Sequence, residues 1–243
     1  CVGKGSTFFA NLCYHIDLEE LFVIKCPLDR FNIKNNELMN REINNYQSII
    51  NHPFLPLFGG VIQDLNFPVI EFINGHTLYN LIKTHSVDDK LKINIIFQLM
   101  IIIEFLHRNH FILRDNKPNN IMIDQNGTVV IIDFDRIIIH EGNIEDEIKT
   151  QDFSSIYIAP ELNSSNFSYE CDIYSLGKII YFIMNGENPK ARCFEDHSII
   201  KKIYEDCIKQ NPKERPSLID LIIDFYVNYH SQIEIDDLCE VYE

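Results

Sequence analysis

Residues 113–120 read LRDNKPNN, and residues 133–134, a short way further along the chain, read DF. This stretch places two acids, a lysine and an asparagine between segments that read as buried strands. Phosphoryl transfer needs these side-chain types: a carboxylate to orient a hydroxyl nucleophile, a cation near the moving phosphoryl group, and carboxylate and amide oxygens for magnesium. The side-chain types of this stretch are those that such chemistry requires.

The order D-x-K-P-x-N followed by D-F resembles the catalytic core of eukaryotic protein kinases. Residues 159–161 read APE, which is similar to the motif that ends the activation segment of that family, and Arg215 matches the arginine that pairs with its glutamate. The resemblance implies an α+β, bilobal fold with a small β-rich N-lobe, which carries one main helix, and a larger, mostly helical C-lobe. It implies a single kinase domain over residues 1–243, divided into an N-lobe (1–72), a hinge (73–76) and a C-lobe (77–243).

The apolar pattern predicts the secondary structure independently of these motifs. Strands are expected at Phe8–Tyr14, Leu21–Cys26, Leu55–Val61 and Phe67–Glu71, and a hairpin at Ile121–Asp124 and Thr128–Ile132. Helices are expected at Asn36–Ile50, Val87–Asn109, Cys171–Met184, His197–Lys209 and Ser217–Tyr229. A small strand-rich part followed by a larger helical part is the bilobal layout.

The resemblance assigns roles to the residues of the opening stretch. Asp115 would orient the substrate hydroxyl and Lys117 would neutralise charge on the γ-phosphate, so these two are the expected catalytic residues. Asn120 and Asp133 would hold Mg²⁺, a hard cation that prefers oxygen ligands. Arg114 is the expected anchor for a phosphorylated activation loop, because a guanidinium binds phosphate through two parallel hydrogen bonds.

Other positions match the phosphate-binding elements of the family. Gly3 and Gly5 resemble the glycine-rich loop, in which the backbone approaches the phosphates closely. Lys25, at the end of the strand 21–26, resembles the lysine that contacts the α- and β-phosphates. Glu42 is its expected helix partner, and Glu37 is the rival acid.

The adenine pocket is expected between the two lobes. Its lining would come from the side chains of Ala10, Val23 and Met122, with Ile70 at the gatekeeper position. The backbones of the hinge residues Glu71 and Ile73 would hydrogen-bond the adenine edge.

Several residues depart from the family pattern. Ala10 is smaller than the usual valine and Val23 is larger than the usual alanine, and three further departures favour an inactive protein. Phe8 replaces the third glycine of the glycine-rich loop. Leu113 replaces a histidine, and this change keeps the apolar packing but removes a hydrogen-bonding group. Asp135 replaces the glycine of D-F-G; aspartate restricts the backbone and adds negative charge near the metal, so a stiffer switch or altered magnesium dependence is expected. The segment 189–207 is also too short for the helix that commonly docks substrates.

The resemblance implies ATP- and Mg²⁺-dependent phosphoryl transfer to Ser/Thr hydroxyls of protein substrates, by a serine/threonine or tyrosine-kinase-like enzyme. The departures favour one alternative, a pseudokinase that acts as a binding or allosteric module. A small-molecule kinase of related fold is a second alternative. The match of residues 159–161 and of Arg215 to the peptide-binding segment of protein kinases argues against it.

Thr150 is the expected site of activation-loop phosphorylation, by the protein itself or by another kinase, and Ser154 is expected to contact Asp115 and Lys117. Asp172 resembles the helix acid that bonds the catalytic loop.

Composition narrows the partners and the compartment. The 36 acidic and 21 basic residues give a net charge of −15, so a nucleic-acid partner is not expected. The longest apolar run, 93–106, is interrupted by polar residues and is too short for a membrane span. Seven cysteines without a C-x-x-C predict neither a disulfide framework nor a zinc site, which indicates a reducing, cytoplasmic location. Because the chain opens at Cys1 without a methionine, a fragment is expected.

Overall fold

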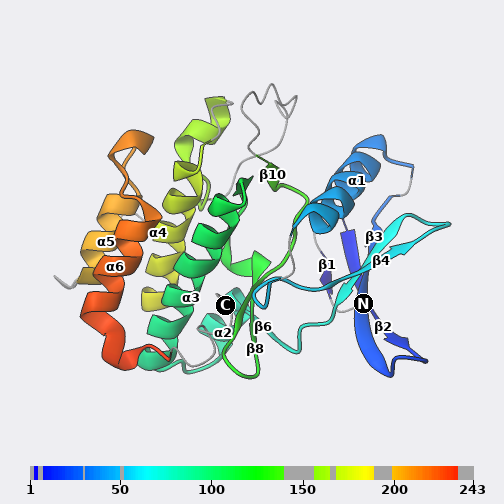
Figure 1. The fold of residues 1–243 in the computed structure, drawn as a ribbon, viewed down its shortest axis with the longest axis horizontal. Helices are drawn as coiled ribbons and strands as arrows, with labels where there is room; N and C mark the ends of the chain where they lie inside the picture. The colour runs from blue at the N-terminus through cyan, green and yellow to red at the C-terminus, as the bar shows by residue number, and fades with distance from the viewer. Residues whose placement is uncertain are drawn as a thin grey trace.

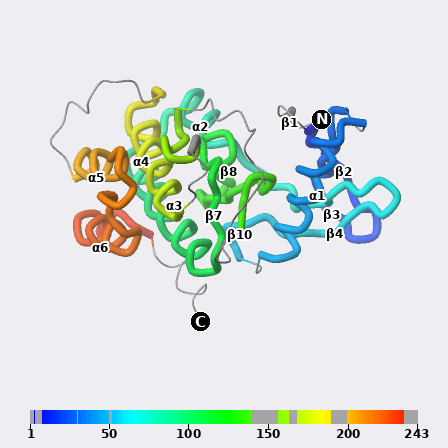
Figure 2. Tube along the Cα trace, turned by 90° about the horizontal axis from the view of Figure 1, so that it is seen from above, coloured from blue at the N-terminus to red at the C-terminus, as the bar shows by residue number. Residues whose placement is uncertain are grey.

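The computed structural model describes residues 3–4, 8–29, 31–49, 52–139, 156–164, 168–188 and 199–234. Strands β1 to β5 and helix α1 form one part of the molecule, and helices α2 to α6 dominate the other (Figure 1). The same division is visible from above, where the two parts lie at opposite ends of the trace (Figure 2). The α+β, bilobal architecture expected from the sequence is therefore confirmed.

A five-stranded antiparallel sheet with the order β1-β2-β3-β5-β4 forms most of the N-lobe. Its strands are β1 (Gly3–Lys4), β2 (Phe8–His15), β3 (Glu20–Pro27), β4 (Phe58–Ile62) and β5 (Phe67–Glu71). Strand β4 begins at Phe58 rather than at the expected Leu55. Pro56 has no N–H to donate to a ladder, and Phe54 and Leu55 are buried in the main apolar core instead.

Helix α1 (Ile33–Ser48) packs against this sheet. It begins earlier than expected because the side chain of Asn32 accepts hydrogen bonds from the N–H groups of Lys34 and Asn35, which is an N-cap. Its apolar face packs with Phe8 of β2 through Leu38, Met39 and Ile43. The same helix carries Glu42, which contacts Lys25, and Asn45, which contacts the backbone of Phe134 and Ile137.

The C-lobe is built around two long helices whose apolar side chains are mostly buried. Its helices are α2 (Leu78–Thr84), α3 (Asp89–Arg108), α4 (Glu170–Asn185), α5 (Ile199–Cys207) and α6 (Leu218–Tyr229). The ends of α3 to α6 agree closely with the expected ranges, whereas α2 was not expected. Helix α5 lies close to α4 at Gly177, where an added Cβ would lie 2.6 Å from the Cβ of Cys207.

Two small sheets and a helical turn flank the segments 113–117 and 132–137. The three-stranded sheet has the order β6-β8-β9, and β7 pairs with β10. Their bounds are β6 (Gly75–Thr77), β7 (Phe111–Ile112), β8 (Ile121–Asp124), β9 (Val129–Ile131) and β10 (Ile138–Ile139), and the 3₁₀ turn η1 spans Pro118–Asn120. Gly75 is required here, since a Cβ at this position would lie 2.0 Å from the carbonyl oxygen of Ile123.

The cysteines and the helices of the described part bear on the questions of disulfides and of membrane spans. Cys13, Cys26, Cys171 and Cys207 are free thiols, and the other three cysteines lie outside the described residues. Within the described ranges, none of the helices combines the length and the apolar character needed to cross a membrane.

Candidate active site

Lys25 of β3 lies between two carboxylates that come from distant segments. Its Nζ donates to Oε1 of Glu42 on α1 and to Oδ1 of Asp133, which follows β9, at 2.8 Å. The Glu42 side chain is fully buried, whereas that of Asp133 is 32% exposed. The structure thus pairs Lys25 with Glu42, as expected, and not with the rival Glu37, which is exposed.

The electrostatics of this cluster follow from burial and from the shared lysine. Burial alone would raise the pKa of Asp133, but Lys25, Lys117 and Arg136 together lower it below its usual value. Burial would lower the pKa of Lys25, but Asp133 and Glu42 outweigh it and raise that pKa. For Glu42 burial dominates over Lys25, and the pKa is raised. Lys25 is therefore firmly cationic, and Asp133 firmly anionic, at neutral pH.

The loop 113–120, expected to be the catalytic loop, is anchored by Asp172 of α4, whose side chain is fully buried. Its carboxylate accepts hydrogen bonds from the N–H groups of Leu113 and Arg114, each at 2.9 Å, and lies 2.9 Å from Nε2 of His107. Arg114 adopts a φ of 66°, a left-handed conformation that is unfavourable for arginine. The expected bond between Asp172 and the loop backbone is confirmed, and these hydrogen bonds hold the loop in its bent path.

Asp115 lies at the centre of the loop with a side chain only 8% exposed. Lys117 Nζ donates to its Oδ2 at 2.6 Å, and Asn120 Nδ2 donates to its backbone oxygen at 3.1 Å and to Oδ2 at 3.4 Å. Arg136 adds an ion pair as a third contact, since its Nε lies 3.6 Å from the same Oδ2. All three side-chain contacts are made to the same carboxylate oxygen, Oδ2, and they fix the orientation of the carboxylate.

Asn120 and Asp133 offer oxygen atoms that suit Mg²⁺. Asn120 uses its Nδ2 on Asp115, and Asp133 uses Oδ1 on Lys25. Among the described residues, neither Asn120 Oδ1 nor Asp133 Oδ2 accepts a hydrogen bond. The N–H of Ile132 donates to the backbone oxygen of Asn120 at 2.9 Å, which ties the two segments together. An amide oxygen and a carboxylate oxygen form a donor set that fits a hard divalent cation.

The residues expected around adenine lie on two sheets, with Ala10, Val23 and Ile70 on the adjoining strands β2, β3 and β5 of one and Met122 on the other. Ala10 is paired with Lys25, Val23 with Ile70, and Met122 lies on β8. Ile70 is buried. Gly3 lies on β1 opposite Ala10, whereas Gly5, Thr150 and Ser154 lie outside the described residues.

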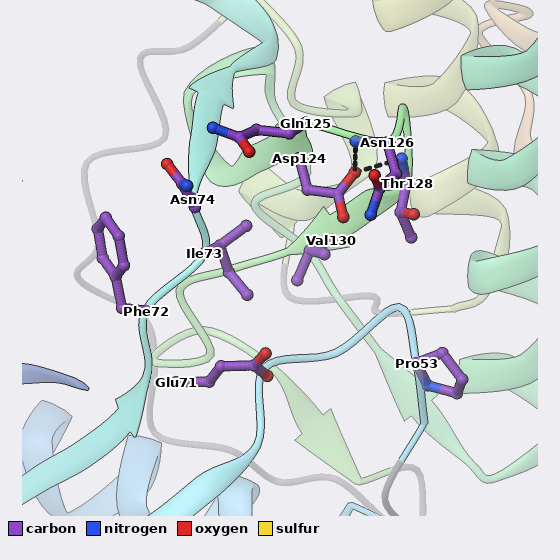
Figure 3. A pocket seen from close by; sticks show the side chains of 10 residues that line it. All are labelled: Pro53, Glu71, Phe72, Ile73, Asn74, Asp124, Gln125, Asn126, Thr128 and Val130. Carbon is purple, nitrogen blue, oxygen red and sulfur yellow. Dashed lines mark hydrogen bonds between the residues drawn. The ribbon is translucent and has the colours of Figure 1, made fainter. Parts of the chain in front are cut away.

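The hinge residues Glu71 and Ile73 contribute side chains to a pocket of about 290 Å³ (Figure 3). Its far wall is the β8–β9 turn, where Asp124 accepts hydrogen bonds from the N–H groups of Asn126 and Thr128. The N–H of Glu71 donates to the carbonyl of Leu57 at 2.9 Å, so an adenine contact at Glu71 would fall to its carbonyl oxygen. None of the catalytic or metal-binding candidates lines this pocket.

The departures from the family pattern have physical consequences that differ from residue to residue. Leu113 and Phe134 are both buried in the main apolar core, which agrees with the expected apolar packing. The positive φ in this stretch, 76°, belongs to Asp133 and not to Asp135, so the aspartate is not forced into the left-handed region, and the stiffer switch or altered magnesium dependence expected from it stays a prediction. Asp135 instead carries an electrostatic penalty: burial, together with Asp133 and Glu42, raises its pKa to about 8.

The expected pair at the end of the activation segment is present. Arg215 donates to both carboxylate oxygens of Glu161, to Oε2 at 2.9 Å and to Oε1 at a shorter distance. Its side chain is fully buried, and it also donates to the carbonyls of Lys209 and Glu170 at 2.9 and 2.8 Å.

Two further residues of the site were missed from the sequence. Asn45 Nδ2 donates to the carbonyls of Phe134 and Ile137, and Arg136 contacts Asp115. A polar residue on the buried face of α1, three positions after Glu42, was the available signal for Asn45. An arginine directly after the unusual Asp135 was the signal for Arg136.

Comparison with known proteins agrees with this geometry. The family model described as protein kinase domain matches residues 1–205. Calcium-dependent protein kinase 27 of Arabidopsis thaliana is 28% identical over 91% of the chain. Serine/threonine-protein kinase 32B of Homo sapiens is 30% identical over 82%, and cAMP-dependent protein kinase type 3 of Saccharomyces cerevisiae is 32% identical over 70%.

The matched regions make up 52%, 49% and 41% of these relatives, so the chain spans about half of their length or less. The family model nevertheless covers most of the chain, including the catalytic loop and residues 159–161. The chain therefore belongs to the protein kinase family.

Proposed function

We propose that the chain transfers the γ-phosphoryl group of ATP to Ser/Thr hydroxyls of protein substrates in a Mg²⁺-dependent reaction. The observation that supports this most is the convergence of Lys25, Asp115, Asn120 and Asp133, which come from separate segments. Lys25 contacts Asp133 directly, and Asn120 contacts Asp115 directly. Polar side chains without a shared role would not be expected to converge from separate segments, with the Asp115 side chain 8% exposed and that of Asp133 32% exposed.

In this proposal each residue has a role that its contacts allow. Asp115 orients the acceptor hydroxyl and receives its proton, while Lys117 balances the negative charge that grows on the transferred group. Lys25, kept in place by Glu42, binds the α- and β-phosphates. Asn120 and Asp133 would hold Mg²⁺, which when bound neutralises phosphate charge.

The acceptor class is inferred from the region near residue 117 and from the activation segment. Lys117 is followed by Pro118, as in the serine/threonine and tyrosine-kinase-like branches of the family. The Glu161–Arg215 pair belongs to the peptide-binding part of protein kinases, which favours a protein over a small-molecule acceptor. Relatives named as serine/threonine kinases support the same choice. The proposal also includes a cytoplasmic location and activation-loop phosphorylation at Thr150. It further includes a single domain with an N-lobe at 1–72, a hinge at 73–76 and a C-lobe at 77–243.

A pseudokinase is the second candidate, and buried Asp135 is the observation that favours it. Asp135 stands where the family has glycine, and its buried carboxyl, whose pKa is raised to about 8 by burial and by Asp133 and Glu42, adds an ionisable group beside the expected metal ligand Asp133. Calorimetric titration with ATP and Mg²⁺ measures binding, and labelled ATP with the protein and with generic Ser/Thr substrates measures transfer.

The wild type is expected to transfer phosphate, and Asp115→Asn is expected to lose nearly all transfer while it still binds nucleotide. Equal transfer by the two proteins, or no transfer by either, would count against catalysis and leave the pseudokinase. Transfer to aminoalcohols or aminoglycosides in place of protein would point to the small-molecule alternative.

A further inference from the structure

Helix α1 is attached to the segment that follows Asp133 by several buried contacts. The N–H of Phe134 donates to Glu42 Oε1 at 3.3 Å, and the Tyr46 ring packs against the Phe134 ring with 4.6 Å between centroids. Asn45 Nδ2 donates to the carbonyl of Phe134 at 2.7 Å and to that of Ile137 at 2.9 Å. One amide nitrogen therefore fixes the chain on both sides of residues 135 and 136.

The Asn45 contacts are strong because they are shielded from water. Asn45 is 5% exposed, and Phe134 and Ile137 are each 1% exposed. If the amide were removed, two buried carbonyls would lose their donor, and each buried polar group left without a partner is unfavourable. The backbone at residues 134–137 must consequently move with α1.

Arg136, whose backbone lies between these two anchored carbonyls, extends to the catalytic loop. Its Nε lies 3.6 Å from Asp115 Oδ2, and the two side chains are 22% and 8% exposed. An ion pair at this depth is screened less than one at the surface, so a shift of Arg136 changes the field and the position of the carboxylate. This contact reaches Asp115 without passing through Lys25.

We propose that Asn45 and Arg136 are positioning residues that form a link from helix α1 to the Asp115 carboxylate. The link transmits the position of α1 to the residue that orients the acceptor hydroxyl, separately from the Lys25–Glu42 pair. The kinetic part of its test rests on the proposed function, whereas the structural part does not.

The test uses the whole chain in four variants: Asn45→Leu, Arg136→Leu, the double variant, and the control Asn44→Leu. Asn44 is the preceding residue of the same helix and is exposed, so the control makes the same substitution without touching the link. Each single link variant is expected to lower kcat by roughly tenfold, because a small misplacement of a catalytic group is costly, with KM for ATP changed by less than about twofold.

The kcat of the double variant is expected to lie within about twofold of the kcat of the slower single variant, because both substitutions break the same link. Arg136→Lys, which keeps the cation, is expected to recover most of the loss, and Asn44→Leu is expected to match the wild type. If Asn45→Leu does not fold, Arg136→Leu and Arg136→Lys still decide the case, since Arg136 is not in the apolar core.

Hydrogen exchange at residues 113–120 provides a readout that does not need activity. Exchange is expected to accelerate by about threefold or more in Asn45→Leu and Arg136→Leu but not in Asn44→Leu. Multiplicative losses in kcat, an unchanged kcat in Arg136→Leu, or unchanged exchange in both link variants would overturn the proposal. If the wild type transfers no phosphate, the proposed function fails, and the exchange result alone then decides whether the link exists.

Discussion

Replacing Arg215 by leucine removes a buried guanidinium that holds three separate parts of the C-lobe together. Arg215 pairs with Glu161 after the activation segment, donates to the carbonyl of Glu170 at the start of α4, and donates to that of Lys209 after α5. It also lies 5.0 Å from the ring centroid of Tyr174. The side chain is fully buried and that of Glu161 is 10% exposed, so water cannot readily replace the lost partner.

The size of the effect follows from this burial. Removing one partner of a buried ion pair typically destabilises a protein by about 3–5 kcal/mol. For a chain of this size each kcal/mol lowers Tm by roughly 2–4 °C, so Arg215→Leu is expected to lower Tm by about 6–20 °C. Thermal unfolding followed by circular dichroism, with urea unfolding as a second measurement, provides both quantities.

The double variant Glu161→Leu/Arg215→Leu tests the reasoning further. Replacing both members of a buried pair by apolar residues is often neutral, so the double variant is expected to be more stable than Arg215→Leu alone. Arg108→Leu is the matched control, because Arg108 pairs with Glu104 at 2.8 Å but is 65% exposed, and a change below about 1 kcal/mol is expected there. A loss below about 1 kcal/mol in Arg215→Leu, or a double variant that is less stable than that single variant, would refute the argument.

Three further predictions concern the catalytic residues and the hinge. Asp115→Asn is expected to lower kcat by about 10²–10⁴ while leaving Tm nearly unchanged, as measured with labelled ATP and circular dichroism; normal turnover would contradict it. Because the pKa of Asp135 is raised from 3.8 to about 8, the folded state keeps a proton that the unfolded state loses, so this group makes stability fall as pH rises through that window. The Tm advantage of Asp135→Asn should therefore be larger at pH 8.5 than at pH 5, and a constant difference would disprove this. Gly75→Ala is expected to be strongly destabilising, because its Cβ would lie 2.0 Å from the Ile123 carbonyl oxygen, whereas Gly59→Ala meets ordinary contacts at 3.4–3.5 Å and should be milder; comparable urea midpoints for the two would contradict this.

Much of the fold could be predicted because the relevant signals are local. The apolar pattern of α3 and of α4 is long enough to define a buried helix, and the β8–β9 hairpin has the turn sequence Asn126-Gly127. Helix α2 was missed because it has only seven residues, too few for a helical period to stand out, although Thr77 caps its start.

The candidate site was predictable where residue order alone carries the information. The pairings of Lys25 with Glu42 and of Glu161 with Arg215 were expected from motifs and are present. The contact of Asn45 with residues 134–137 was not, because it joins a helix and a loop far apart in the chain and depends on how α1 docks. The raised pKa of Asp135 could not be predicted from residue order either, because it depends on burial and on the approach of Asp133 and Glu42.

The two carboxylates that already share Lys25 affect how ligands would enter this site. An incoming triphosphate meets an ammonium group that is engaged by Asp133 at 2.8 Å, so its binding is an exchange of anions rather than the neutralisation of a lone cation. If the lysine released Asp133 Oδ1 in this exchange, both oxygens of that carboxylate would be open to a divalent ion. We therefore expect nucleotide and metal to raise one another's affinity by an equal factor, as thermodynamic reciprocity requires of coupled binding.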